Sequence, residues 1–195
     1  MRQSAFLVTG SFLGLIVGSS VAMGAVYDES IDGDLSGDRF NPTFIDFDLG
    51  VNTVINETVN AEIESGDIDY LTFSVGAGQW VDSIIIADTF NPNGGLDMGV
   101  FVGLAFDNFF DFDIDGFIGD GLEGFIITDF TNVGFESIET LSGGLTTLGQ
   151  GDYTLWIQQG NVDITRVTTH INIVPAPSAM ALLGLGGLAS IRRRR

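Results

Sequence analysis

Short runs of alternating apolar and polar residues recur through the middle of the chain. In the run 69–75, Leu71, Phe73 and Val75 share one face of an extended chain, with Thr72 and Ser74 opposite. Alternation with a period of two indicates a β-strand that is buried on one side. Turn-forming residues separate these runs, and the same pattern predicts further strands over 80–87, 98–106, 153–158 and 163–173.

The apolar positions of the last two runs also fall on single faces, which are Tyr153, Leu155 and Ile157 in one and Val167, Ile171 and Ile173 in the other. No stretch of the body keeps a helical period. About seven short strands at this spacing are typical of two packed antiparallel sheets. We therefore expect an all-β body over residues 51–173, an antiparallel β-sandwich of jelly-roll-like form.

The first 25 residues have the layout of a secretory signal peptide. Arg2 supplies a positive start, an apolar run follows, and the small residues Ala22, Gly24 and Ala25 favour cleavage after Ala25. An uncleaved N-terminal anchor is the alternative. Residues 26–50 then form an acidic leader ahead of the predicted domain.

The opposite end, residues 174–195, has three parts in a fixed order. A proline motif breaks regular structure, a short apolar helix is expected over 179–191, and four arginines close the chain. A spanning helix needs about 20 apolar residues, so the segment favours a transient stop in the membrane over a permanent anchor. The motif and the basic cluster comprise Val174, Pro175, Ala176, Pro177, Arg192, Arg193, Arg194 and Arg195.

This ordered tail resembles the PEP-CTERM sorting signal, with Ala176 standing where the commonest form has glutamate. The resemblance implies two processing partners during export, a signal peptidase and an exosortase-type transpeptidase that cleaves near the proline motif. Hosts of such systems typically make exopolysaccharide. We therefore expect an exported protein at the cell surface or in the extracellular matrix, with a transient inner-membrane intermediate.

The body resembles the bacterial pre-peptidase C-terminal (PPC) β-sandwich domains over residues 51–173. The resemblance rests on the acidic Gly-Asp-Ile-Asp-Tyr opening at 66–70, the Phe-Ser-Val strand at 73–75 and the Gly-Asp-Tyr-Thr-Leu segment at 151–155. It implies a non-catalytic module of adhesion, binding or targeting. The acidic segment 107–123 fits the family pattern poorly and is interpreted as an insertion.

Charge is concentrated in the body of the chain. All 26 acidic residues lie between residues 26 and 174, where Arg39 and Arg166 are the basic residues, so the formal charge of this stretch is −24. Such a surface repels nucleic acid and anionic headgroups and suits divalent cations. The chain has no cysteine and a single histidine, His170, which argues against zinc sites.

A calcium loop is the sharpest local motif. Alternating aspartates precede a glycine turn, as at the start of an EF-hand loop, but Leu122 stands where a bidentate glutamate belongs. The other interpretation is a half-buried strand with the same aspartates in water. The candidate ligands are Asp111, Asp113, Asp115, the carbonyl of Phe117, and Asp120.

A second acidic cluster spans residues 28–38, and it either ligates calcium or forms a solvated leader. Asp67 and Asp69, at the start of a predicted strand, are expected to cap a turn. Trp156 lies opposite the inferred core face, where it either stacks on a sugar ring or packs against other residues.

Taken together, these patterns favour a secreted, non-enzymatic surface or matrix protein, linked to adhesion or exopolysaccharide. A carbohydrate-binding module, with or without calcium, is the alternative. A small hydrolase is the third hypothesis, although no nucleophile elbow of the Gly-x-Ser-x-Gly kind accompanies His170.

Overall fold

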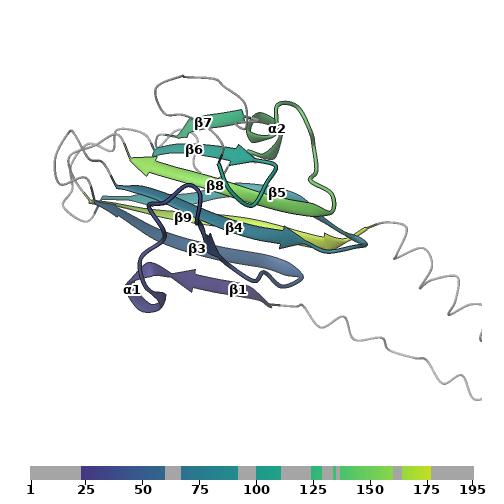
Figure 1. Cartoon of the computed structure of the whole chain (residues 1–195), viewed down its shortest axis with the longest axis horizontal. Coiled ribbons are helices and arrows are strands. Elements are labelled where there is room, and N and C mark those ends of the chain that lie inside the picture. The colour runs from purple at the N-terminus through teal and green to yellow at the C-terminus, as the bar shows by residue number, and fades with distance from the viewer. Residues whose placement is uncertain are drawn as a thin grey trace, which may run out of the picture.

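The computed structural model describes residues 23–59, 67–91, 100–110, 124–128, 134, 137–159 and 164–176. In this part of the chain the structure is mostly β, with two short helices (Figure 1). The elements are β1 (Met23–Asp28), α1 (Glu29–Asp32), β2 (Thr43–Phe44), β3 (Gly50–Val59), β4 (Ile68–Val75), β5 (Gln79–Phe90), β6 (Val100–Ala105), β7 (Gly124–Thr128), α2 (Ile138–Leu141), β8 (Gly151–Gln159) and β9 (Ile164–Pro175).

The described strands form two sheets. One has the order β1-β3-β9-β5 and the other the order β2-β4-β8-β6-β7. The five strands expected from the alternating pattern are all present, as β4, β5, β6, β8 and β9. The chain passes from one sheet to the other between β4 and β5, where Gly78 takes a positive φ of 75° that favours glycine.

Pairing is antiparallel between the strands that the alternation predicted, but two short edge strands differ. β1 pairs with β3 in parallel, and β2 pairs with β4 in parallel. The antiparallel pairing expected for residues 51–173 therefore holds for the described pairs within that range, and the two parallel pairs involve strands that precede it. Both strands come from residues 26–50 or just before them, a range in which the sequence analysis placed no strand.

Side chains from both sheets meet in one buried hydrophobic cluster. It contains the inward positions expected from the sequence in β4, β8 and β9. Leu35 and Ile45 also belong to this cluster, with exposed fractions of 3% and 7%. The segment 26–50 thus packs into the body as part of the same folded unit, where a separate leader was expected.

A second, smaller cluster lies on the outer face of the β4-β8-β6 sheet. Tyr70 and Trp156 are cross-strand partners there, and Phe110 covers them with ring centroids 5.7 Å and 6.0 Å away. Among the described residues, no helix is both long and apolar enough to cross a membrane.

Candidate functional site

The predicted calcium loop cannot be placed, because Asp111, Asp113, Asp115, Phe117 and Asp120 lie outside the described residues. The same holds for Pro177 and the terminal arginines of the predicted sorting tail.

The first part of the predicted sorting motif belongs to the β-rich body. Val174 and Pro175 end strand β9, and the backbone N–H of Ala176 donates to the carbonyl of Gly78 at 2.7 Å. The pairing of β9 with β3 ends at Ile173, so β5 is the neighbour that holds the last two residues of the strand.

Trp156 packs inside the second cluster with 6% of its surface exposed. Its ring centroid lies 4.5 Å from that of Phe101 and 5.9 Å from that of Tyr70. A buried ring offers no face to a sugar, so the structure favours the packing interpretation of this residue.

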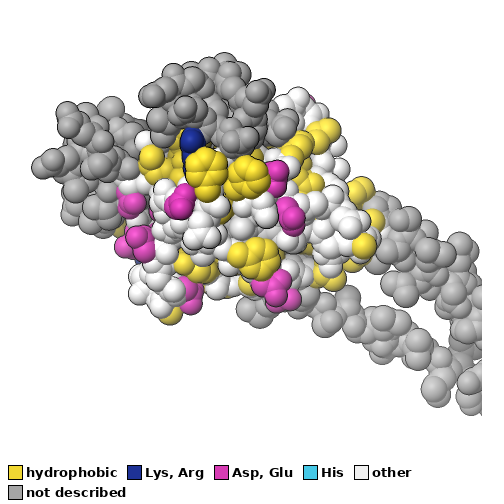
Figure 2. All heavy atoms as spheres, viewed as in Figure 1, with side chains coloured by type: hydrophobic (Ala, Val, Ile, Leu, Met, Phe, Trp, Pro, Cys, Tyr) yellow, Lys and Arg dark blue, Asp and Glu magenta, His cyan; other side chains and the backbone are white. Residues whose placement is uncertain are grey.

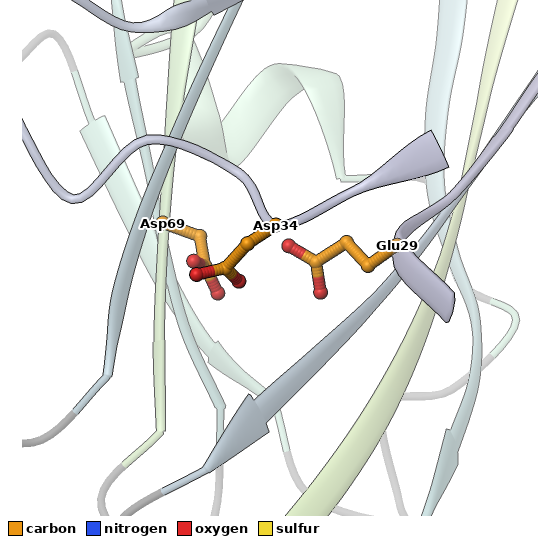
Figure 3. A group of neighbouring side chains, drawn as sticks. All are labelled: Glu29, Asp34 and Asp69. Carbon is orange, nitrogen blue, oxygen red and sulfur yellow. The ribbon is translucent and has the colours of Figure 1, made fainter. Parts of the chain in front are cut away.

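Three carboxylates from separate segments converge near one end of the sheets (Figure 3). Glu29 begins α1, Asp34 follows the turn after that helix, and Asp69 lies in β4. One carboxylate oxygen of each residue lies within 4.8 Å of those of the other two. Asp69 is 1% exposed, Glu29 is half-buried and Asp34 is exposed, so the cluster runs from the protein interior to its surface.

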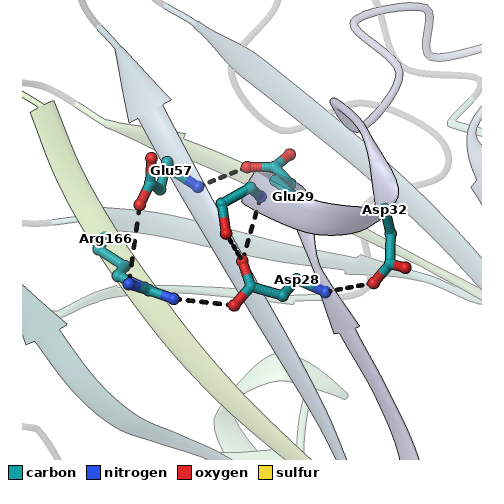
Figure 4. Close-up of polar contacts among 6 residues, drawn as sticks. Asp28, Glu29, Asp32, Glu57 and Arg166 are labelled. Atoms are coloured by element: carbon teal, nitrogen blue, oxygen red, sulfur yellow. Dashed lines mark hydrogen bonds and ion pairs between the residues drawn. The ribbon is translucent and has the colours of Figure 1, made fainter.

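Backbone groups hold the Glu29 carboxylate in place. The N–H of Leu35 donates to Oε1 at 2.9 Å, and the N–H of Glu57 donates to Oε2 (Figure 4). The turn that carries Asp34 is fixed in turn by Tyr27, whose hydroxyl donates to the carbonyl of Gly33 at 2.6 Å. Hydrogen bonds within the protein therefore hold both the Glu29 carboxylate and the turn that carries Asp34.

Asp69 contacts a buried amide from the opposite sheet. Nδ2 of Asn56, on β3, donates to Oδ2 of Asp69 at 3.1 Å. Asn56 is fully buried, and its Oδ1 has no hydrogen-bond partner; the same is true of Oδ1 of Asp69. Buried oxygens normally find a partner, so these two call for an explanation.

Burial and mutual repulsion make the carboxylates hold protons more tightly. Burial, together with the charges of Glu29 and Asp67, raises the pKa of Asp69 to about 8. Burial also raises the pKa of Glu29 to about 7, with Asp34 and Asp67 adding to the effect. The folded protein therefore favours the protonated, neutral form of both carboxyl groups more than an unfolded chain does.

Two ion pairs lie close to the three-carboxylate cluster, and both involve Arg166. Arg166 of β9 lies 2.9 Å from Asp28 and 3.8 Å from Glu57, so it ties the end of β1 to the middle of the sheet (Figure 4). The Ser30 hydroxyl also donates to Asp28, and this bond, helped by Arg166, lowers the pKa of that carboxyl. In the described residues these are the ion pairs of this region, and neither includes a member of the three-carboxylate cluster.

A second feature is a groove of about 300 Å³ on the outer side of β4 and β8. Phe40 and Phe44, which are 58% and 59% exposed, supply aromatic surface. Polar groups stand beside them, including Asn108 and Asp152, and the guanidinium of Arg39 lies 4.6 Å from the ring of Phe40. Figure 2 shows hydrophobic and acidic side chains next to one another on the face it presents.

The sequence analysis named the acidic regions that contain the three carboxylates, but it did not predict that these carboxylates lie close together. Asp34 fell in the acidic stretch 28–38, and Asp69 was expected to cap a turn. Positions 29 and 69 are 40 apart in the chain, and no local spacing rule connects them. Asn56 is fully buried and shares its strand face with Asn52 and Val54, so β3 directs buried amides as well as apolar side chains toward the interior.

Comparisons with known proteins give no relative from which to transfer a role: no family model matches the chain, and no curated protein matches it.

Proposed function

We propose that the chain is an exported, non-enzymatic protein that an exosortase-type system delivers to the cell surface or the extracellular matrix. Its body acts as a β-sandwich module of jelly-roll-like form. The observation that carries the proposal is the ordered tail at 174–195, with its proline motif, apolar segment and four arginines. The opposite end adds the layout of a signal peptide.

The position of the two ends supports this proposal. Met23 of β1 pairs with Val51 of β3, and Val51 pairs with Asn172 of β9. The start of β1 and the end of β9 therefore lie at the same end of one sheet (Figure 1). A body attached to a membrane through both flanking segments would therefore extend away from the membrane in one direction.

The register of β1 is compatible with removal of a signal peptide after Ala25. Regular pairing with β3 begins at Val26 and continues through Tyr27 and Asp28, whereas an irregularity separates Met23 from Val26. Cleavage would thus preserve the regular part of the strand. The body left behind has a formal charge of −24 and would be repelled by anionic headgroups once released.

The test is to express the full chain in a host with an exosortase and in the same host without it. We expect a tail cleaved near Pro175–Pro177 in the first strain and an intact, membrane-associated chain in the second, read by mass spectrometry of the C-terminal peptide. Replacing the four terminal arginines with glutamine should block processing, and Arg39→Gln should leave it unchanged. Equal processing in both strains would exclude exosortase sorting.

Glycan binding is the second candidate function, and the groove beside Phe40 and Phe44 favours it. Exposed aromatic rings next to amide and carboxylate groups suit a sugar ligand. The rings pack against the C–H surface of the sugar, and the polar groups form hydrogen bonds with its hydroxyl groups. Exopolysaccharide of the host is the expected ligand. This proposal places the ligand at the groove and leaves the buried Trp156 with a packing role.

A binding assay with purified exopolysaccharide separates these possibilities. Phe44→Ala and Asp152→Ala should weaken binding by about tenfold or more, because each removes one kind of contact from the groove. Phe90→Ala is the matched control, since Phe90 is equally large and 55% exposed but lies on β5 of the other sheet. Equal losses in all three variants would mean that binding does not use the groove.

A further inference from the structure

The three-carboxylate cluster has the donor chemistry of a site for a hard divalent cation. Its oxygens come from Glu29, Asp34 and Asp69, and they lie within 4.8 Å of one another (Figure 3). The donors are all oxygens, which suits calcium or magnesium rather than zinc or copper. An acidic cluster alone is common on acidic proteins, so a second observation is needed.

Asn56 supplies that observation. Its side chain is fully buried, its amide group lies against the Asp69 carboxylate, and its Oδ1 has no partner. Oδ1 of Asp69 is likewise buried and without a partner. A cation between these groups would use the free oxygen of Asp69, and rotation of the Asn56 amide by half a turn would present its carbonyl oxygen as well.

In the part of the chain that the structure describes, neither arginine forms an ion pair with the three-carboxylate cluster. In the described part of the chain, Arg166 pairs with Asp28 and Glu57, and Arg39 lies over the ring of Phe40. Both Glu29 oxygens already accept backbone N–H groups, and each retains a lone pair for a metal.

We propose that Glu29, Asp34, Asp69 and Asn56 bind one calcium ion. Calcium takes six to eight oxygens in flexible geometry, so these four residues leave places for water or backbone carbonyls. Magnesium is disfavoured because it demands near-ideal octahedral geometry and gives up water reluctantly. The inference does not depend on the proposed sorting or on glycan binding.

Bound calcium would join three separate parts of the molecule. Glu29 and Asp34 belong to the N-terminal segment, Asn56 to the β1-β3-β9-β5 sheet and Asp69 to the other sheet. A single ion would thus fasten the N-terminal segment to both sheets at one end. Calcium would then raise the melting temperature of the protein, because it binds the folded state alone.

The experiment measures calcium stoichiometry and affinity by titration calorimetry on the full chain after removal of metal with a chelator. Asp34→Asn and Asp69→Asn should each lower the number of bound ions by one, or weaken that site by about tenfold or more. Asp34 is exposed, so its variant should fold normally. Asp88→Asn, an exposed carboxylate on β5, is the matched control and should bind as the parent does.

Asp113→Asn distinguishes this site from the acidic segment 111–120. Under the proposal, the cluster site persists in Asp113→Asn and its thermal stabilisation by calcium remains. The proposal is overturned if the full chain binds no calcium at millimolar concentration, or if Asp34→Asn and Asp69→Asn leave both stoichiometry and affinity unchanged. Loss of all binding in Asp113→Asn would also overturn it.

Discussion

Asn56 and Asp69 form a hydrogen bond that joins the two sheets. The amide belongs to β3, the carboxylate belongs to β4, and Nδ2 lies 3.1 Å from Oδ2 in a setting where both side chains are fully or almost fully buried. Buried polar contacts of this kind are strongly coupled to their surroundings because water cannot replace a lost partner.

Removing the amide should therefore destabilise the protein. We expect Asn56→Ala to lower the free energy of unfolding by about 1–3 kcal/mol in the presence of a chelator, since Asp69 would lose its side-chain partner. Denaturation with urea, followed by tryptophan fluorescence, measures the change. Asn108→Ala, at an exposed position, is the control and should differ from the parent by less than about 0.5 kcal/mol.

The carboxylate cluster predicts a pH dependence of stability in the metal-free protein. The pKa values of Asp69 and Glu29 are about 8 and about 7 in the folded state, and an unfolded carboxyl has a pKa near 4. The folded state therefore binds more protons between about pH 4 and pH 8. This contribution to stability is fully present below the unfolded pKa and is lost as the pH rises through the folded values.

Melting temperatures at several pH values between 5 and 9, with a chelator present, test this expectation. The parent should lose stability across this interval, and Asp69→Asn should show a shallower decline because its amide does not titrate. The comparison between the two proteins removes the contribution of the other acidic residues. Parallel profiles for parent and variant would show that Asp69 does not titrate in the expected range.

Trp156 should behave as a packing residue. Trp156→Ala is expected to cost about 3–5 kcal/mol of stability, because the ring fills the space between Tyr70, Phe101 and Phe110. Trp156→Phe keeps an aromatic ring at this position, so it should cost much less stability than Trp156→Ala. Thermal unfolding measures both, and a Trp156→Ala protein that melts like the parent would contradict the packing role.

Arg166 should contribute modestly and in a salt-dependent way. Its side chain is 37% exposed and its guanidinium pairs with Asp28 at 2.9 Å, so Arg166→Gln is expected to cost about 0–1 kcal/mol. The cost should shrink in molar salt because screening weakens the pair in the parent. Denaturant titrations at low and high salt measure this, and an effect that grows with salt would point to a cause other than the ion pair.

The sequence alone determined the β-rich body and its inward faces. Leu71, Phe73 and Val75 were expected to share a buried face, and all three are buried. The prediction succeeded because neighbouring side chains of a strand point to opposite sides, so a core on one side imposes a local period of two. Most of both ends, residues 1–22 and 177–195, and the acidic segment 111–120 fall outside the described residues, and the assignments of both ends and of that segment remain predictions.

The tertiary structure decided the placement of the N-terminal segment and the composition of the acidic site. Leu35 and Ile45 lie in the acidic stretch that was expected to be a leader, and their burial depends on contacts with distant strands. Glu29, Asp34 and Asp69 meet because β1 pairs in parallel with β3 and the chain then crosses to the other sheet in β4. Local patterns record which face of a strand is buried, but a site assembled across two sheets depends on long-range pairing, which leaves no period in the sequence.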